Sequence, residues 1–308
     1  ESLDQKIASY YKDAISVTLG ENQYLKILGN DGNAVYATLD LGAAVSRIKE
    51  FKFDKMIYVV GYEQSDYFLK LFKALSILGY NATNNCEHLA TGHLILEEGK
   101  MSSRKGNVIL LEDVLRLTIE HARKIIEQKQ EMSEKEQAAF KIDELEKLAE
   151  TLGIGALKYL ILSKDPQSQI KYTEEQAFNL KGKSAPFAQY TYARTQSILQ
   201  KIDIQHVITQ YVRKSCSIAE ECSQTISIDY TTEREHELIR RIADFPIIVN
   251  DAAKIRKPQI ITEYIHLLAS SFNRFYHETD SILNEKDIFA QYSRMRLLQA
   301  FQQTMKNA

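Results

Sequence analysis

A group of cations and hydroxyls in the first half of the chain could bind an anion. The stretch EEGKMSSRKGNVILLEDVL holds five such side chains between two glycines: Lys100, Ser102, Ser103, Arg104 and Lys105. Glycine permits unusual backbone angles, while the side chains supply charged and neutral donors. Such a loop suits a polyanion whose charge grows during reaction, as in displacement at a nucleotide phosphate. A solvated basic loop is the alternative that composition leaves open.

A second group of reactive side chains lies in CEHLATGH, residues 86–93. Cys86, His88 and His93 are zinc-ligand types, but the set lacks a convincing fourth partner. We therefore predict no metal site.

The composition is that of an ordinary soluble protein. The chain has 308 residues, of which 44% are apolar and 26% charged, with a net charge of −2. Its apolar stretches fall short of the ~20 residues that a membrane helix needs, so we expect no membrane span. Three cysteines argue against a disulfide framework and for the cytoplasm. The charge balance excludes no partner, because one basic face suffices to bind nucleic acid.

The distribution of glycine divides the chain. Nine of the 12 glycines lie between Gly20 and Gly106, and none follows Gly182. Strand hairpins usually need such turn residues, so we expect the end of the chain to be helical. The predicted parts are a mixed α/β domain at 1–111, a mostly helical connecting region at 112–183 and an all-helical domain at 184–308.

In the α/β part, the pattern predicts strands and helices in alternation. We expect strands at 24–28, 35–39 and 56–60 and helices at 41–51 and 66–78. The first two strands flank GNDGN, a hairpin signal, and Asp40 could cap the helix that follows. The apolar strand MIYVV is typical of a buried parallel sheet, and Gly79 would end the second helix. The order indicates a doubly wound nucleotide-binding layer.

The remainder of the chain shows helical periodicity. Capping boxes are predicted at Ser133–Glu136, Thr173–Gln176 and Thr232–Glu235. Three apolar stripes would face a core: Leu238, Ile242, Phe245, Val249 and Ala252; Ile261, Ile265, Leu268, Phe272 and Phe275; and Met295, Leu298, Phe301 and Met305. These stripes, with the helix at 186–199, indicate a bundle of at least four helices.

Four ordered motifs resemble one family. Lys-Met-Ser-Ser-Arg is similar to the signature loop of class I aminoacyl-tRNA synthetases, in the form typical of arginyl-tRNA synthetases. YATLDLGAA and KMIYVVGYEQSDYFLKLF resemble the catalytic domain of that family. PFAQYTYAR and the run at 245–276 resemble its anticodon-binding domain. The resemblance extends from Tyr24 to the end of the chain.

This resemblance implies a fold and an activity. The fold would be the second half of a Rossmann-like catalytic domain, followed by a helical anticodon-binding domain. The activity would be that of a monomeric arginine–tRNA ligase that uses L-arginine, ATP with Mg²⁺, and tRNA-Arg, without a structural metal. The sequence has no His-x-Gly-His motif and no counterpart of the family's N-terminal tRNA-elbow-binding domain. We therefore expect a fragment that is inactive alone.

Two other functions remain open. The alternative is a non-catalytic tRNA-binding module derived from a class I synthetase. A cysteine-specific synthetase is a more distant option, because its expected thiol-selective zinc site is not evident.

The resemblance also implies site residues. The five polar residues of the opening loop would be catalytic: Lys100, Arg104 and Lys105 would neutralise the triphosphate, and Ser102 and Ser103 would add hydroxyl and backbone N–H donors. ATP would be bound by His88, Gly92, Lys100 and Met101. Ser103 stands where many class I enzymes have a second lysine, so Arg104, Lys105 or a residue outside the chain would replace it.

The matching positions for arginine are Tyr36, Asp40 and Gln64. A planar guanidinium favours a carboxylate with flat polar or aromatic neighbours, and these side chains could converge on one. The alternative is that Asp40 only caps a helix and Tyr36 lies on a sheet surface. Tyr67 stands where many relatives have histidine, and we assign it no catalytic role.

The helical domain would bind RNA. An unpaired anticodon needs aromatic or arginine planes for stacking, and the candidates are Tyr190, Arg194, Tyr276 and His277. Candidates for phosphate contacts are Lys183, Lys254, Arg256 and Lys257. The alternative is that the aromatic stripes belong to the core.

Overall fold

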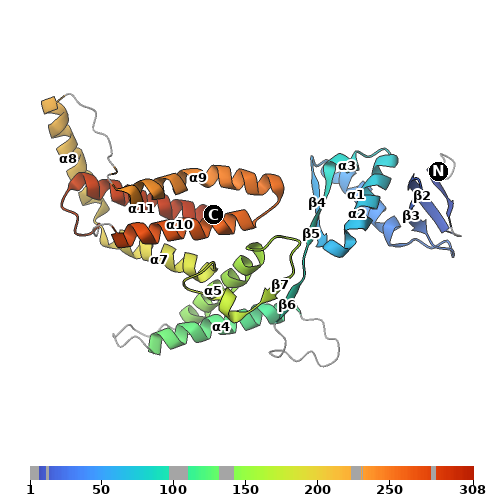
Figure 1. Cartoon of the computed structure of the whole chain (residues 1–308), viewed down its shortest axis with the longest axis horizontal. Coiled ribbons are helices and arrows are strands. Elements are labelled where there is room, and N and C mark those ends of the chain that lie inside the picture. The colour runs from blue at the N-terminus through green and yellow to red at the C-terminus, as the bar shows by residue number, and fades with distance from the viewer. Residues whose placement is uncertain are drawn as a thin grey trace. The chain divides into compact units, whose positions relative to one another are not determined.

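The computed structural model describes residues 7–11, 14–96, 110–131, 142–222, 230, 232–278 and 282–308 (Figure 1). The chain divides into two units with separate cores. The first unit comprises residues 1–93 with Pro166–Gln169, and the second comprises Leu94–Asp165 with Ile170–Ala308. The domain boundaries predicted at 111 and 183 stay predictions.

The first unit combines an antiparallel sheet with a parallel strand pair. The antiparallel sheet has the order β1-β2-β3, and β4 pairs with β5 in parallel. Val17 of the sheet and Leu71 and Leu75 of α2 are buried in one core. The elements are β1 (Ala8–Tyr11), β2 (Ala14–Gly20), β3 (Gln23–Leu28), α1 (Tyr36–Phe51), β4 (Met56–Gly61), the 3₁₀ helix η1 (Tyr62–Gln64), α2 (Ser65–Ile77), α3 (Ala82–Asn85) and β5 (Cys86–Thr91).

Residues 35–39, predicted as a strand, lead into a helix instead. α1 begins at Tyr36, and Ala37, Leu41 and Ala44 are buried along it at helical spacing. These small and branched side chains pack one face of the helix against the core of the unit. Burial of that face outweighs the strand preference of the local sequence, so the strand predicted at 35–39 is wrong. The predicted turn at GNDGN does form: Gly29 N–H donates to the Asn33 carbonyl at 2.8 Å, and Leu28 and Ala34 make an antiparallel bridge.

The earlier helix start also changes the position of Asp40. Val35 is the N-cap of α1 and makes no side-chain cap hydrogen bond. Asp40 lies in the second turn, so the prediction that it caps a helix beginning at Leu41 is wrong. Tyr36 and Asp40 are four positions apart in one helix and therefore share one face.

The parallel strand predicted at 56–60 is confirmed as β4, but it is not wholly buried. Its side chains alternate, and those of the outer face are exposed, with Ile57 at 40% and Val59 at 64%. The other face packs against the core of the unit. The apolar run therefore predicted the strand and its parallel pairing, but not the exposure of one face.

The helix predicted at 66–78 is confirmed as α2. Gly79 ends it in the left-handed region, with a φ of 93°. The next residue, Tyr80, donates its N–H to the Leu75 carbonyl, which is the expected closing bond of a helix C-terminus.

The second unit is mostly helical, as predicted for the residues after 112. Its one described sheet is the short parallel pair of β6 with β7, which begins at Leu94–Ile170. The capping box at Thr173 is confirmed in part, since its hydroxyl accepts from Gln176 N; the one at Ser133–Glu136 lies outside the described residues. The elements are β6 (Leu94–Leu96), α4 (Leu111–Glu131), α5 (Ile142–Leu162), β7 (Ile170–Tyr172), α6 (Glu174–Ala177), α7 (Ala185–Lys201), α8 (Ile204–Cys222), α9 (Glu233–Ile255), α10 (Gln259–Glu278) and α11 (Ile288–Asn307).

The predicted helical bundle is confirmed by the last five helices, α7 to α11. Figure 1 shows α9, α10 and α11 running alongside one another. Residues from all three predicted stripes are fully buried together: Leu238, Leu268, Phe272, Phe275, Met295, Leu298 and Phe301. Three predicted stripe residues are at least partly exposed and lie outside this core. Val249 is 37% exposed and Ile248 packs against the core in its place, while Ile261 and Ile265 are half-buried and line a cavity.

A buried arginine forms ion pairs with two glutamates from other segments of the bundle, one at the start of α9 and one just before α11. Thr232 and Glu235 form the predicted capping box at the start of α9. Arg294 of α11 then donates from Nε to Glu235 Oε1 and from Nη1 to Glu285 Oε2, both at 2.7 Å. The side chains of Arg294 and Glu235 are only 8% and 3% exposed. Removing one partner of such a pair would leave the other charge buried without a counter-charge, which is strongly destabilising.

Candidate functional site

A carboxylate and two tyrosines meet where α1 faces the beginning of α2. Tyr67 of α2 donates its hydroxyl to Asp40 Oδ2 of α1 at 2.6 Å. Tyr36, one turn before Asp40, has its ring centroid 6.2 Å from that of Tyr67 and is 71% exposed. The carboxylate therefore lies beside an exposed aromatic ring and is held by a hydroxyl from the neighbouring helix.

The hydroxyl of Tyr67 remains a donor at neutral pH. Burial, and then the hydrogen bond and negative charge of Asp40, raise the pKa of Tyr67 above its ordinary value near 10. Its bond occupies one site on one oxygen, and a carboxylate has about four acceptor sites. The site can therefore still accept hydrogen bonds from a cation.

Gln64, the third predicted arginine ligand, lies just before α2. It is the N-cap residue of that helix and its side chain is half-buried. Gln64 therefore lies three positions before Tyr67, immediately outside α2. Tyr67 itself was noted in the sequence but assigned no role, and its hydrogen bond to Asp40 was not predicted.

The two residues predicted to line an adenosine pocket lie on or beside β5. His88 is half-buried, its ring stacks on Phe68 with centroids 4.6 Å apart, and its Nε2 lies 3.1 Å from the Val60 carbonyl oxygen. These are the contacts of a packed strand residue. Its role toward ATP stays a prediction.

Gly92 lies where two distant segments of the first unit touch. Its N–H donates to the Pro166 carbonyl at 2.6 Å. A Cβ at this position would lie 1.9 Å from the Ser168 carbonyl oxygen, so only glycine fits. This packing explains the glycine without reference to a ligand.

The cationic loop that carries the predicted triphosphate contacts lies outside the described residues. This concerns Lys100, Met101, Ser102, Ser103, Arg104 and Lys105. Their assignment stays a prediction from the sequence motif.

In the second unit, an arginine lies between two tyrosine rings. The guanidinium carbon of Arg194 on α7 is 4.9 Å from the centroid of the Tyr190 ring and 5.4 Å from that of Tyr276 on α10. Tyr190 is 54% and Tyr276 39% exposed. The exposed His277 follows, with its ring 5.7 Å from that of Tyr276. The structure therefore brings all four predicted RNA-contacting residues into one surface cluster. We call it the tyrosine–arginine cluster; its members are Tyr190, Arg194, Tyr276 and His277.

Two polar residues orient this cluster, and sequence reasoning missed both. Arg194 donates to Asn273 Oδ1 at 3.2 Å, and Asn273 donates from Nδ2 to the buried Thr191 hydroxyl, also at 3.2 Å. Arg194 also donates to the Tyr190 hydroxyl at 3.1 Å. The spacing of three residues between Asn273 and Tyr276 was the available signal.

The residues predicted to contact phosphates differ in their surroundings. Lys183 pairs with Glu263 at 2.5 Å, and Lys257 pairs with Asp165 at 2.7 Å. Arg256 donates to the Ala253 carbonyl oxygen, and Lys254 is exposed. A phosphate would have to compete with two carboxylates for the paired lysines.

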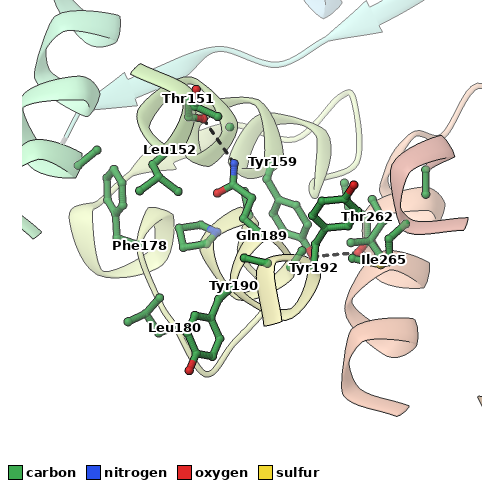
Figure 2. A pocket seen from close by; sticks show the side chains of 18 of the residues that line it. Thr151, Leu152, Tyr159, Phe178, Leu180, Gln189, Tyr190, Tyr192, Thr262 and Ile265 are labelled. Atoms are coloured by element: carbon green, nitrogen blue, oxygen red, sulfur yellow. Dashed lines mark hydrogen bonds between the residues drawn. The ribbon is translucent and has the colours of Figure 1, made fainter. Parts of the chain in front are cut away.

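An apolar cavity of about 850 Å³ opens beside the tyrosine–arginine cluster. Figure 2 shows Gln189 turned toward Thr151 and its neighbour Tyr190 turned away from it. Gln189 donates from Nε2 to the Thr151 carbonyl oxygen at 3.4 Å, while its buried Oε1 has no hydrogen-bond partner among the described residues. Tyr190 thus lines this cavity and also contacts Arg194.

Two features are absent from the described residues. These residues contain no group of three or more His, Cys, Asp or Glu side chains that could hold a metal ion. They also contain no helix long and apolar enough to cross a membrane.

Two family models match the chain in the predicted order. Residues 11–173 match the catalytic domain of class I (R) tRNA synthetases. Residues 188–308 match the DALR anticodon-binding domain. The sites on α1 and α2 lie in the first match, and the tyrosine–arginine cluster lies in the second.

Curated relatives and a solved structure agree with these matches. The chain is 31% identical to the arginine–tRNA ligase of Alkaliphilus metalliredigens over 89% of its length, and 35% identical to that of Parabacteroides distasonis over 85%. It covers 44% and 41% of these relatives, so it spans less than half of their length.

The Thermus thermophilus arginyl-tRNA synthetase structure matches 98% of the chain with a TM-score of 0.75 and 21% identity, and the chain covers 54% of it. At that identity the likeness concerns the fold alone. The catalytic-domain match, which spans more than half of the sequence, shows that this chain belongs to the class I (R) tRNA synthetase family.

Proposed function

We propose that the protein containing this chain is an arginine–tRNA ligase. The arginine carboxylate attacks the α-phosphate of ATP, which forms arginyl-adenylate and releases pyrophosphate. The 2′-hydroxyl of the terminal adenosine of tRNA-Arg then takes the arginyl group and releases AMP. The observation that carries the proposal is the Asp40 carboxylate, held by Tyr67 beside the exposed ring of Tyr36, within a class I (R) catalytic domain.

For arginine, we propose that Asp40 pairs with the guanidinium, that Tyr36 covers its plane and that Gln64 supplies a further polar contact. Charge-assisted hydrogen bonds between guanidinium and carboxylate are about twice as strong as neutral ones. Because the site would leave its carboxylate unpaired with an uncharged amino acid, it would reject substrates without the guanidinium.

For ATP, we propose contacts from the cationic loop and from the end of β5. Lys100, Arg104 and Lys105 would neutralise the triphosphate as its charge reorganises, with Ser102, Ser103 and Met101 beside them. His88 and Gly92 would lie toward the adenosine. Mg²⁺ would arrive with the phosphates, because that ion is commonly held by substrate oxygens and water rather than by a protein cage.

For tRNA, we propose that Tyr190, Arg194, Tyr276 and His277 contact unstacked bases of the anticodon loop. Exposed rings and a guanidinium plane are the surfaces on which such bases stack. The protein would act as a monomer in the cytoplasm, where tRNA is charged.

The first test is the activity itself. We expect the longest protein translated from the reading frame that contains this chain to catalyse arginine-dependent ATP–pyrophosphate exchange with tRNA present. The 308-residue chain alone should show none, because its sequence has no His-x-Gly-His motif. No exchange in the longer protein, combined with tRNA binding, would favour the non-catalytic module; exchange by the isolated chain would contradict the second expectation.

The second test concerns the tyrosine–arginine cluster. Arg194→Lys keeps the charge but removes the planar group that lies between Tyr190 and Tyr276, so tRNA-Arg affinity should fall about 10-fold. The slope of affinity against salt should stay the same, because the number of neutralised phosphates does not change. Arg213→Lys, at an exposed site on α8, is the matched control. Fluorescence anisotropy with labelled tRNA measures both, and wild-type affinity in Arg194→Lys would remove the cluster from the interface.

A further inference from the structure

We propose that Tyr67 is a positioning residue that orients the Asp40 carboxylate toward the guanidinium of arginine. The inference rests on the proposed role of Asp40 in binding arginine. It assigns a task to a residue for which the sequence motifs give none.

The geometry of α2 makes Tyr67 a fixed donor. Leu71, one turn further along α2, and Leu75 are fully buried, so the helix is anchored in the core of the unit. The ring of Tyr67 packs edge-on against the buried Phe68, with centroids 5.5 Å apart. Its hydroxyl therefore reaches Asp40 from a supported position.

A fixed donor restricts what the carboxylate can do. Asp40 rises from the second turn of α1, and an unrestrained carboxylate there would rotate about its Cβ–Cγ bond. The 2.6 Å bond from Tyr67 to Oδ2 selects one orientation before the substrate arrives. Binding then loses less side-chain entropy, which is how a preorganised site gains affinity.

A tyrosine hydroxyl also keeps this orientation independent of pH. The ionisable groups that face Tyr67 are Asp40 and Tyr36 on α1 and Tyr58 on β4. Burial and these neighbours raise the pKa of Tyr67, so its proton stays in place throughout the neutral range. A histidine in its place would titrate near pH 6.5 or above, because the Asp40 carboxylate favours the imidazolium. That cation would pair with Asp40 and compete with the substrate.

Two variants of the longest translated protein test the proposal. Tyr67→Phe should raise the KM for arginine about 10-fold, as expected for a lost hydrogen bond to a charged group, with the KM for ATP changed by less than about twofold. Tyr67→His should show an arginine KM that rises as the pH falls through about 6.5, which is absent from the parent protein. Tyr80→Phe is the control, because it removes another half-buried hydroxyl from the same core. ATP–pyrophosphate exchange between pH 5.5 and 8.5 measures all of these.

The possible outcomes separate this inference from the function on which it rests. An arginine KM that is unchanged in Tyr67→Phe, or a Tyr67→His profile parallel to that of the parent, would overturn the positioning role. If Asp40→Asn also left the arginine KM unchanged, the assignment of Asp40 would fail as well. A rise in Asp40→Asn without one in Tyr67→Phe would remove only the role of Tyr67.

Discussion

Replacing Asp40 with asparagine is expected to raise the KM for arginine about 100-fold or more, while the KM for ATP changes by less than about twofold. Asparagine keeps the size of the side chain and can still accept from Tyr67, but it carries no charge. The guanidinium would then lose its charge-assisted pairing, which amounts to about 3 kcal/mol for that fold-change.

The measurement is arginine-dependent ATP–pyrophosphate exchange by the longest translated protein, with each substrate varied in turn. Glu50→Gln is the matched control, because it neutralises an exposed carboxylate on the same helix. A parallel loss for both substrates would indicate a folding defect. An arginine KM equal to that of the parent would show that Asp40 does not bind the guanidinium.

Removing Arg294 is expected to have the largest effect on the stability of the chain. Arg294→Met should lower the free energy of unfolding by about 3–5 kcal/mol, because it leaves the buried carboxylate of Glu235 and the partly buried carboxylate of Glu285 without their cation. Arg296→Met removes an exposed cation two positions along α11 and should change that free energy by less than about 0.5 kcal/mol. Urea unfolding followed by circular dichroism compares the two variants.

The pH dependence of this difference gives a second readout. Burial alone would raise the pKa of Glu235, but hydrogen bonds from Arg294 and Thr232, together with the charge of Arg294, hold it below its ordinary 4.5. A lowered pKa in the folded state contributes stability above pH 4.5, and this contribution disappears as the pH falls through the folded value. The difference in the free energy of unfolding between the parent chain and Arg294→Met should therefore become smaller below about pH 4.5. A difference in the free energy of unfolding that stays constant from pH 7 to 3 would contradict the stabilisation of ionised Glu235 by Arg294.

Features that depend on one helical turn could be predicted from the sequence. The capping box at Thr232 and the stripes through Leu268 and Phe301 are confirmed, since caps and helical periodicity act within a few residues. The order of the two domains also followed from local motifs. The fold class could therefore be predicted from the sequence.

Features that depend on contacts between distant segments could not be predicted. The start of α1 at Tyr36 follows from burial of one helix face against strands and a helix elsewhere in the unit, which outweighs the local strand preference. The bond from Tyr67 to Asp40 joins residues on two helices. No periodic pattern in the sequence predicts such a pair, because each partner is an ordinary polar residue in its own helix.

The tyrosine–arginine cluster lies between these two cases. Tyr190 and Arg194 are four positions apart in one helix, so their contact is readable from spacing alone. Their meeting with Tyr276 needs α10 to lie beside α7, which only the packing of the bundle determines. The motif therefore indicated the candidates, and the structure showed that they form one surface.

The contact between Gly92 and Pro166 also bears on the order of events during synthesis. The first unit contains nearly all of the chain up to His93, yet it includes Pro166–Gln169 as well. The roughly 70 residues between the two contacts take several seconds to translate at about 5–20 residues per second. Throughout that interval the nascent chain contains the residues of the strands and helices of the first unit but lacks the segment that packs on Gly92. The end of β5 therefore gains this packing only after the residues of α4 and α5 have been translated, so the first unit is completed during synthesis of the second.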